Sequence, residues 1–267
     1  MNVDAATERY FQLLQALDQA VIATDPAGAI ILWSPAAESL YGWRADEVVG
    51  RSVLEVTPME MSRAQGAEIM EALARGELWS GEFQVRTHDG RPFMASVTDI
   101  PLLDDSGVVA GVIGVSAPSR TPTSLRPLLS QFAAAVETIW PNQVTFKLHV
   151  PEEATVQASE PHMIQLLAVL ILLHARTLDR GGLEVSAMAA DTSPFADFGM
   201  AYTSPALYVR IDRRSARVAY SVLRSVPFSE EPTKRASALV RMVGGILMAG
   251  SAPDGMDAMH LFLPLIR

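Results

Sequence analysis

Cysteine is missing from this chain of 267 residues. Its absence excludes disulfide bonds and metal sites built on thiolates. Basic residues are also scarce, because 21 Lys and Arg stand against 30 Asp and Glu, which gives a net charge of −9. Binding to nucleic acid phosphates requires clustered Lys and Arg, so we expect no nucleic acid partner.

Long apolar runs are absent as well. The longest, residues 163–173, is interrupted by Gln165 and is too short to span a bilayer, so it predicts a buried helix. Residues 1–10 include Asp4 and Glu8 and lack the apolar centre of a secretory signal. We therefore expect a cytoplasmic protein with no membrane span.

The chain does contain enough apolar residues, 49% of the total, for the cores of two domains. Its most informative stretch is residues 20–50. Two apolar runs flank the turn DPAG at 25–28, which predicts a hairpin because proline fixes φ and glycine accepts a left-handed backbone. Ser34 and Pro35 then predict the start of a helix, and Gly50 predicts the end of a short one.

The segment TDPAGAIILWSPAAESLYGWRADEVVG within this stretch resembles the opening of a PAS sensor domain. The family pattern runs strand, D-x-x-G turn, strand, capped helix, aromatic-Gly-aromatic step and a short helix that ends in glycine. Ser34 stands where many members have asparagine, and both residue types cap helices. The similarity continues to about residue 116.

The remainder of the first part follows the same order. Alternation predicts a strand over residues 79–86, and tight turns predict two further strands after it, over 93–103 and 108–116. Apolar spacing predicts helices over 5–17 and 60–75. The resemblance then implies an α+β domain, residues 1–118, with a five-stranded antiparallel sheet. The Pro-, Ser- and Thr-rich sequence that follows predicts a linker, residues 119–123.

The residues leave the cofactor of this domain open. A haem needs an axial histidine, and the helix over 60–75 has none, while His88 falls in a turn and is interpreted as a solvated polar residue. Without cysteine, the cysteinyl–flavin photoadduct of some light-sensing relatives is excluded. A small ligand or a flavin in an apolar pocket and an empty, tightly packed core both stay open. We assign no cofactor and no metal site.

The second part, residues 124–267, resembles the ATP-binding domain of sensor histidine kinases, the GHKL type. The resemblance implies an α/β sandwich with helices layered on a mixed sheet, and it is clearest in the closing hairpin, GGILMAGSAPDGMDAMHLFLPL. Helices are predicted over 124–140, 160–178, 216–226 and 233–243, and strands over 144–150, 183–189, 206–211, 246–250 and 259–264.

The nucleotide-binding residues of that family are where this chain departs from it. The two asparagines of the family's helix, one of which binds magnesium, fall on Leu170 and His174. Leucine cannot ligate a hard cation, and a neutral imidazole is a poor ligand for magnesium. The glycines of the family's lid fall in KRASALV, around Ala236, so a phosphate-cradling loop is missing from the sequence.

The D-x-G-x-G box of the family is lost too. Aligned on its flanking apolar residues, the box falls on Arg213, Ser215 and Arg217, and arginine offers no acceptor to the adenine amino group. A shift by one residue brings Asp212 near that place, but it breaks the inward alternation of the strand. The vestigial pocket around all these positions is therefore not expected to bind ATP or magnesium.

A phosphoacceptor is missing as well, because the one helix between linker and strand, residues 124–140, contains no histidine. The resemblance then implies a non-catalytic signalling protein. In this reading a PAS sensor is joined to a degenerate kinase-like domain that contacts a kinase, a response regulator or a transcription factor, in a homodimer.

Two alternatives stay open. One is an active or atypical histidine kinase or phosphotransfer protein of a two-component system. The other is a ligand sensor whose second half binds a different anion through Arg210, Arg213, Arg214 and Arg217.

Overall fold

The computed structural model describes residues 5–57, 63–103, 108–119, 122–175, 182–190, 206–213, 236, 238–243, 245–251 and 257–266. The chain divides into two compact units. The N-terminal unit contains Leu14–Arg120 with Ser159–Gln165, and the C-terminal unit contains Met1–Leu13, Thr121–Ala158 and Leu166–Arg267. Two helices, α1 (Ala5–Ala16) and α7 (Glu160–Ala175), therefore contribute residues to both units.

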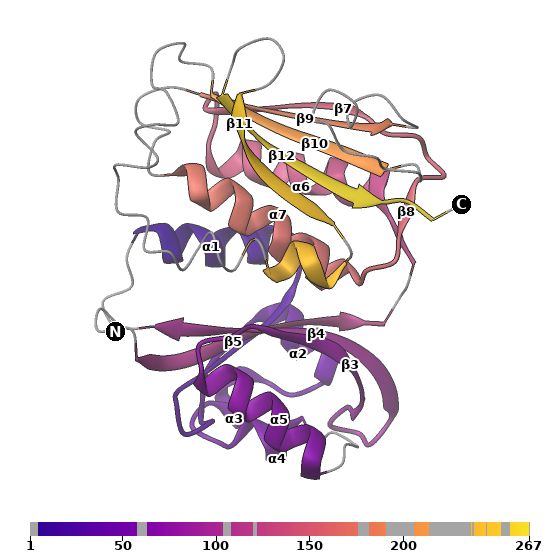
Figure 1. The fold of residues 1–267 in the computed structure, drawn as a ribbon. Coiled ribbons are helices and arrows are strands. Elements are labelled where there is room, and N and C mark those ends of the chain that lie inside the picture. The colour runs from indigo at the N-terminus through magenta and orange to yellow at the C-terminus, as the bar shows by residue number, and fades with distance from the viewer. Residues whose placement is uncertain are drawn as a thin grey trace. The chain divides into compact units, whose positions relative to one another are not determined.

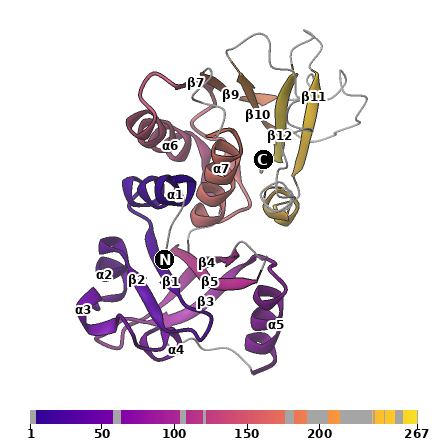
Figure 2. The ribbon, with the colours of Figure 1, turned by 90° about the vertical axis from the view of Figure 1, so that its left-hand side faces the viewer.

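A five-stranded antiparallel sheet forms the N-terminal unit, in the order β2-β1-β5-β4-β3. Its strands are β1 (Ala20–Thr24), β2 (Ile30–Trp33), β3 (Trp79–Arg86), β4 (Pro92–Leu103) and β5 (Val109–Pro118). Its helices are α2 (Pro35–Tyr41), α3 (Ala45–Val48), α4 (Val53–Val56) and α5 (Arg63–Ala74). All of these helices lie on one face of the sheet (Figures 1 and 2). The expected α+β architecture of this part is confirmed.

Local sequence explains how the chain enters this fold. The Asp25 side chain accepts two backbone N–H groups of its own turn, and Gly28 completes that turn at φ +83°. Ser34 caps α2 by accepting the N–H of Ala37 at 3.1 Å. Gly42 ends α2 in the left-handed conformation at φ 78°. Glycine adopts this conformation with little strain because it has no Cβ.

The core of the N-terminal unit lies between the sheet and its helices. Aromatic and branched side chains from both layers fill it, among them Ile30, Trp33, Tyr41, Phe83 and Val85. In β3 the buried residues alternate with exposed ones, as a strand with one face on a core requires. This core fixes which face of each strand points toward the helices.

The C-terminal unit is built on a second five-stranded sheet, in the order β11-β12-β10-β9-β7. Only β7 and β9 pair in parallel, and the other described neighbours are antiparallel. Its strands are β7 (Val144–His149), β9 (Leu183–Ala190), β10 (Ala206–Arg213), β11 (Ile246–Ser251) and β12 (Asp257–Pro264). A short pair, β6 (Thr123–Ser124) with β8 (Thr155–Val156), stands apart from this sheet.

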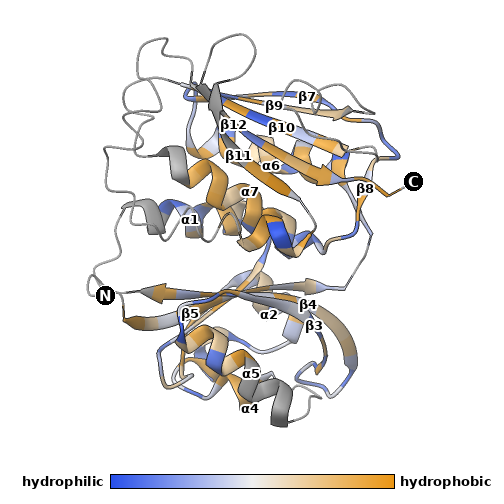
Figure 3. Ribbon diagram, in the orientation of Figure 1, coloured by the Kyte–Doolittle hydropathy of each residue, from blue (hydrophilic) through white to orange (hydrophobic). Residues whose placement is uncertain are grey.

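Two helices cover one face of that sheet, α6 (Leu125–Ile139) and α7 (Figures 1 and 2). The buried residues of α6 recur at helical spacing, with Leu125, Leu128, Phe132 and Val136 on one side. Residues 161–171 of α7 are all buried, which matches a helix that is apolar all round. Figure 3 shows apolar residues along both helices.

The expected elements are largely confirmed in the described ranges, with three differences. The sequence did not predict α4, β6 and β8, because elements this short show no periodicity. Thr123, expected to end a linker, is buried and paired in β6. The expected helix over 216–226 lies outside the described residues, and of the helix over 233–243 the structure describes 236 and 238–242 as helical.

No helix in the described ranges is long and apolar enough to cross a membrane.

Candidate functional site

One lateral row of residues crosses the helix-facing side of the N-terminal sheet and includes an unexpected carboxyl. Strand register pairs Trp33 with Ile22, Ile22 with Gly114, Gly114 with Asp99, and Asp99 with Trp79. Residues opposite each other on paired strands point to the same face. Because Ile22 and Trp33 belong to the buried core, Asp99 lies on the apolar side of the sheet.

The surroundings of Asp99 leave its carboxyl without a polar partner among the described residues. Gly114 lies against it so closely that an added Cβ would come 2.7 Å from Oδ1 of Asp99. The side chain is half-buried. Burial disfavours the charged form and raises the pKa of Asp99 from 3.8 to about 7. The protein therefore holds a titratable group inside an apolar layer.

A phenol lies near this carboxyl. Tyr41, at the end of α2, is buried, and its Oη donates to Oγ of Ser116 at 3.0 Å. Burial raises the pKa of Tyr41 to about 12; the hydrogen bond with Ser116 lowers it, and the charge of Asp99 raises it. The phenol is thus a neutral donor at neutral pH, held in place by β5.

Aromatic rings border Asp99 on the side of β3. The indole of Trp79 lies over Gly81, where an added Cβ would come 2.3 Å from the ring. The same indole stacks on Phe83, with ring centroids 4.8 Å apart. Trp79, Val97 and Asp99 all keep intermediate exposure, so solvent reaches this part of the face.

The opposite face of β4 carries a hydrogen-bonded cluster directly behind this site. Thr98 Oγ1 lies 2.9 Å from Oγ of Ser80, and Ser80 lies 3.3 Å from Nδ1 of His162. Gln165, fully buried, donates to the carbonyl of Thr98 at 2.9 Å. Because Asp99 and Thr98 are adjacent in β4, a shift of the strand at one residue moves the other.

The described side chains on the inner face limit which group the site can hold. The row contains no histidine to ligate a haem, and the described ranges contain no group of three His, Asp or Glu residues that could hold a metal ion. His88, expected to be solvated, is exposed in the turn before β4, and its ring packs against Trp43 at a tilt of 30°, with centroids 3.8 Å apart. Rings, a hydroxyl and one carboxyl suit a small organic ligand.

Comparison with known proteins identifies this part of the chain. Residues 8–116 match the family model of the PAS fold. Residues 8–116 therefore form a PAS domain.

Three similar proteins each match about two fifths of this chain. Phototropin-2 of Oryza sativa subsp. japonica is 30% identical over 105 residues, which are 38% of this chain and 12% of that protein. A PAS domain from Colwellia psychrerythraea is 21% identical, over 43% of this chain and 98% of that chain, with a TM-score of 0.38. A light-oxygen-voltage domain studied with a flavin analogue is 24% identical, over 40% of this chain and 82% of that chain, with a TM-score of 0.36.

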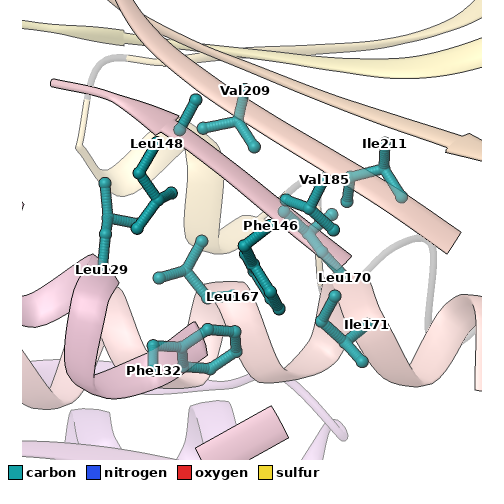
Figure 4. Close-up of a pocket in the computed structure, with 11 residues that line it drawn as sticks. Leu129, Phe132, Phe146, Leu148, Leu167, Leu170, Ile171, Val185, Val209 and Ile211 are labelled. Carbon is teal, nitrogen blue, oxygen red and sulfur yellow. The ribbon is translucent and has the colours of Figure 1, made fainter. Parts of the chain in front are cut away.

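The vestigial pocket expected in the second part is only partly described. Leu170 is fully buried and faces the sheet in an apolar cavity of about 10 Å³ (Figure 4). Leucine, isoleucine, valine and phenylalanine side chains from α6, α7, β7, β9 and β10 line this cavity with Ala187. Ala236 is buried as well. For His174 and Arg213 the structure describes the backbone alone.

Two expected residues, Ser215 and Arg217, lie outside the described ranges, as does Arg214 of the expected basic cluster. The alternation of β10 is clear where it is described. Ile211 lines the apolar cavity, while Asp212 pairs with Arg210 at 2.8 Å. Arg210 is thus already bound to a carboxylate within its own strand.

Sequence reasoning did not single out Asp99, although a signal for it was present. In the strand FMASVTDIPLL, the positions two apart from Phe93 read Phe, Ala, Val, Asp and Pro. A single carboxyl in the otherwise apolar half of an alternating strand is a buried polar group, which is more informative than an exposed one.

Proposed function

We propose that this chain is a signal-transduction protein. Its PAS domain senses a small ligand, and its second part is a degenerate histidine-kinase-like domain that acts through protein contacts. The single observation that carries the second half of this proposal is Leu170, which is buried in an apolar cavity. The resemblance places one of the family's two asparagines at this position.

Chemistry supports this interpretation of Leu170. Magnesium requires oxygen ligands in octahedral geometry, and nucleotide phosphates require backbone or cationic donors. The cavity around Leu170 is lined only by hydrocarbon side chains and measures about 10 Å³ (Figure 4). A charged ligand placed there would lose its hydration without gaining a partner.

The layout of the C-terminal unit is also compatible with a kinase-like scaffold. Two helices lie on one face of a mixed five-stranded sheet, as the resemblance implies. We propose domain boundaries at residues 1–118 and 124–267, with a linker over 119–123. Homodimerisation, a location in the cytoplasm, and a kinase, response regulator or transcription factor as partner belong to the same proposal.

Titration of Mg-ATP into the full chain tests the non-catalytic role. We expect no measurable heat, whereas micromolar binding would overturn the proposal. Incubation with labelled ATP, or with a phosphorylated response regulator, complements this test. An acid-labile label on any histidine of the chain would support an active kinase or phosphotransfer protein instead.

Absorption spectroscopy and mass analysis of the purified full chain test the sensory role. A small molecule that co-purifies, a flavin among the possible outcomes, supports ligand sensing. Protein that comes without a ligand and gains no stability from any metabolite in a broad thermal-shift screen would argue for a structural PAS domain.

A further inference from the structure

We propose that the ligand of the PAS domain is a small organic cation, held by the carboxylate of Asp99 beside the indole of Trp79. This inference rests on the proposed sensory function, because it names the chemical class of ligand for that site. It is carried by the row of residues across the inner face of the sheet.

The first step is the state of the carboxylate. No described residue forms a hydrogen bond or an ion pair with Asp99, although burial in an apolar layer normally requires one. The burial that raises the pKa of this group means that the protein itself does not compensate its charge. A cationic ligand would supply the compensation that is missing.

The second step is space. Gly114, opposite Asp99 on β5, presents no side chain, and any Cβ there would approach Oδ1 to 2.7 Å. Ile22 follows Gly114 on β1, so the row around the carboxyl offers hydrocarbon and bare backbone. A glycine at this point leaves room for the carboxyl itself on the helix-facing side, and the intermediate exposure of Asp99 keeps it within reach of solvent.

The third step is the partner on β3. Trp79 pairs with Asp99 across the two strands, and it keeps intermediate exposure. Cations are attracted to the faces of indole rings, and the attraction strengthens as water is excluded. A carboxylate next to an indole favours an amine or quaternary ammonium over a neutral or anionic ligand, because like charge would repel an anion.

The experiment compares cations with uncharged molecules of the same shape on the full chain. Choline is paired with 3,3-dimethyl-1-butanol, and benzylamine with benzyl alcohol, and binding is measured by thermal shift and calorimetry. We expect at least one cation to bind about 10- to 100-fold more tightly than its neutral counterpart, as charge-assisted contacts imply. Equal or weaker binding of both cations would overturn the inference.

Two variants and a control assign the effect to the site. Asp99→Asn keeps the shape of the side chain and should abolish the preference for the cation. Gly114→Ala keeps the charge but pushes on Oδ1, and it should weaken cation binding as well. Glu77→Gln removes an exposed carboxylate whose partner is Arg75, and it should change nothing. A preference that survives Asp99→Asn would place the cation elsewhere and refute the assignment.

The outcomes separate this inference from the function on which it rests. If a neutral or anionic molecule such as a flavin co-purifies in the PAS domain, the sensory function stands and the cation inference fails. If no small molecule of any kind binds, both fail together.

Discussion

The substitution Asp99→Asn provides the most direct test of the site's electrostatics. Asparagine has nearly the shape of aspartate but carries no charge, so the variant isolates the cost of ionising this side chain within the PAS core. Because the folded protein raises the pKa of Asp99 from 3.8 to about 7, the folded state holds the proton more tightly than the unfolded chain does. The variant should therefore be more stable than the wild type at alkaline pH and similar to it in acid.

The sign and size of the stability difference follow from the linkage between proton binding and folding. Below the pKa of Asp99 in the unfolded chain, the carboxyl is protonated in both states, and its ionisation costs no stability. As the pH rises from 3.8 to about 7, only the unfolded chain gains by releasing the proton, and wild-type stability falls over that window. About three pH units at about 1.4 kcal/mol each give an upper limit of about 4 kcal/mol. Solvent reaches the half-buried carboxyl and reduces this cost. We therefore expect the variant to be ~2 kcal/mol more stable than the wild type above pH 7.5.

Hydrogen exchange of the ligand-free full chain measures this stability difference in the strands around Asp99. Wild type and variant are compared at the same pH, on peptides from β4 and β5, at pH 5 and pH 8. We expect slower exchange of these peptides in the variant at pH 8, with a smaller difference at pH 5. Faster exchange in the variant at pH 8, or a difference that does not depend on pH, would refute the reasoning.

Three further substitutions test other contacts of the structure. Tyr41→Phe removes the donor to Ser116 and should cost about 1 kcal/mol in thermal or urea denaturation, so an unchanged stability would contradict the described bond. Gly81→Ala places a Cβ 2.3 Å from the ring of Trp79. The indole must move, which should cost about 2 kcal/mol and shift tryptophan fluorescence to the red; unshifted emission would argue against the packing. Leu170→Asn introduces into α7 the amide that the proposed kinase-like relationship would have at this position, but buries it in hydrocarbon, so we expect a loss of about 3 kcal/mol and no gain of Mg-ATP binding. Nucleotide binding by that variant would contradict the proposal that this part of the chain does not bind ATP.

Strong local patterns explain which structural elements could be predicted from the sequence. The DPAG turn, the Ser34 cap and the alternation of β3 are each determined by a few neighbouring residues, and the structure has them as expected. The elements that were missed, α4, β6 and β8, are two to four residues long. Such short pieces depend on distant partners, as the pairing of Thr123 with Val156 shows.

The candidate site could not be found in the same way. Its residues come from all five strands of the sheet and from α2, and their proximity depends on strand order and register. The order β2-β1-β5-β4-β3 brings the last strand of the domain between the first strand and β4, and so places Gly114 between Ile22 and Asp99. Nothing local in any one strand specifies that arrangement.

By itself the sequence determined the absence of thiol chemistry, the succession of strands and of all helices but α4 over the PAS domain, and the apolar residue at position 170. Those properties belong to composition and to short-range spacing. The tertiary structure alone decided that one carboxyl of β4 would face an apolar layer, next to a glycine and an indole. The reason is that burial and charge compensation depend on which segments meet across the sheet, and those segments lie far apart along the chain.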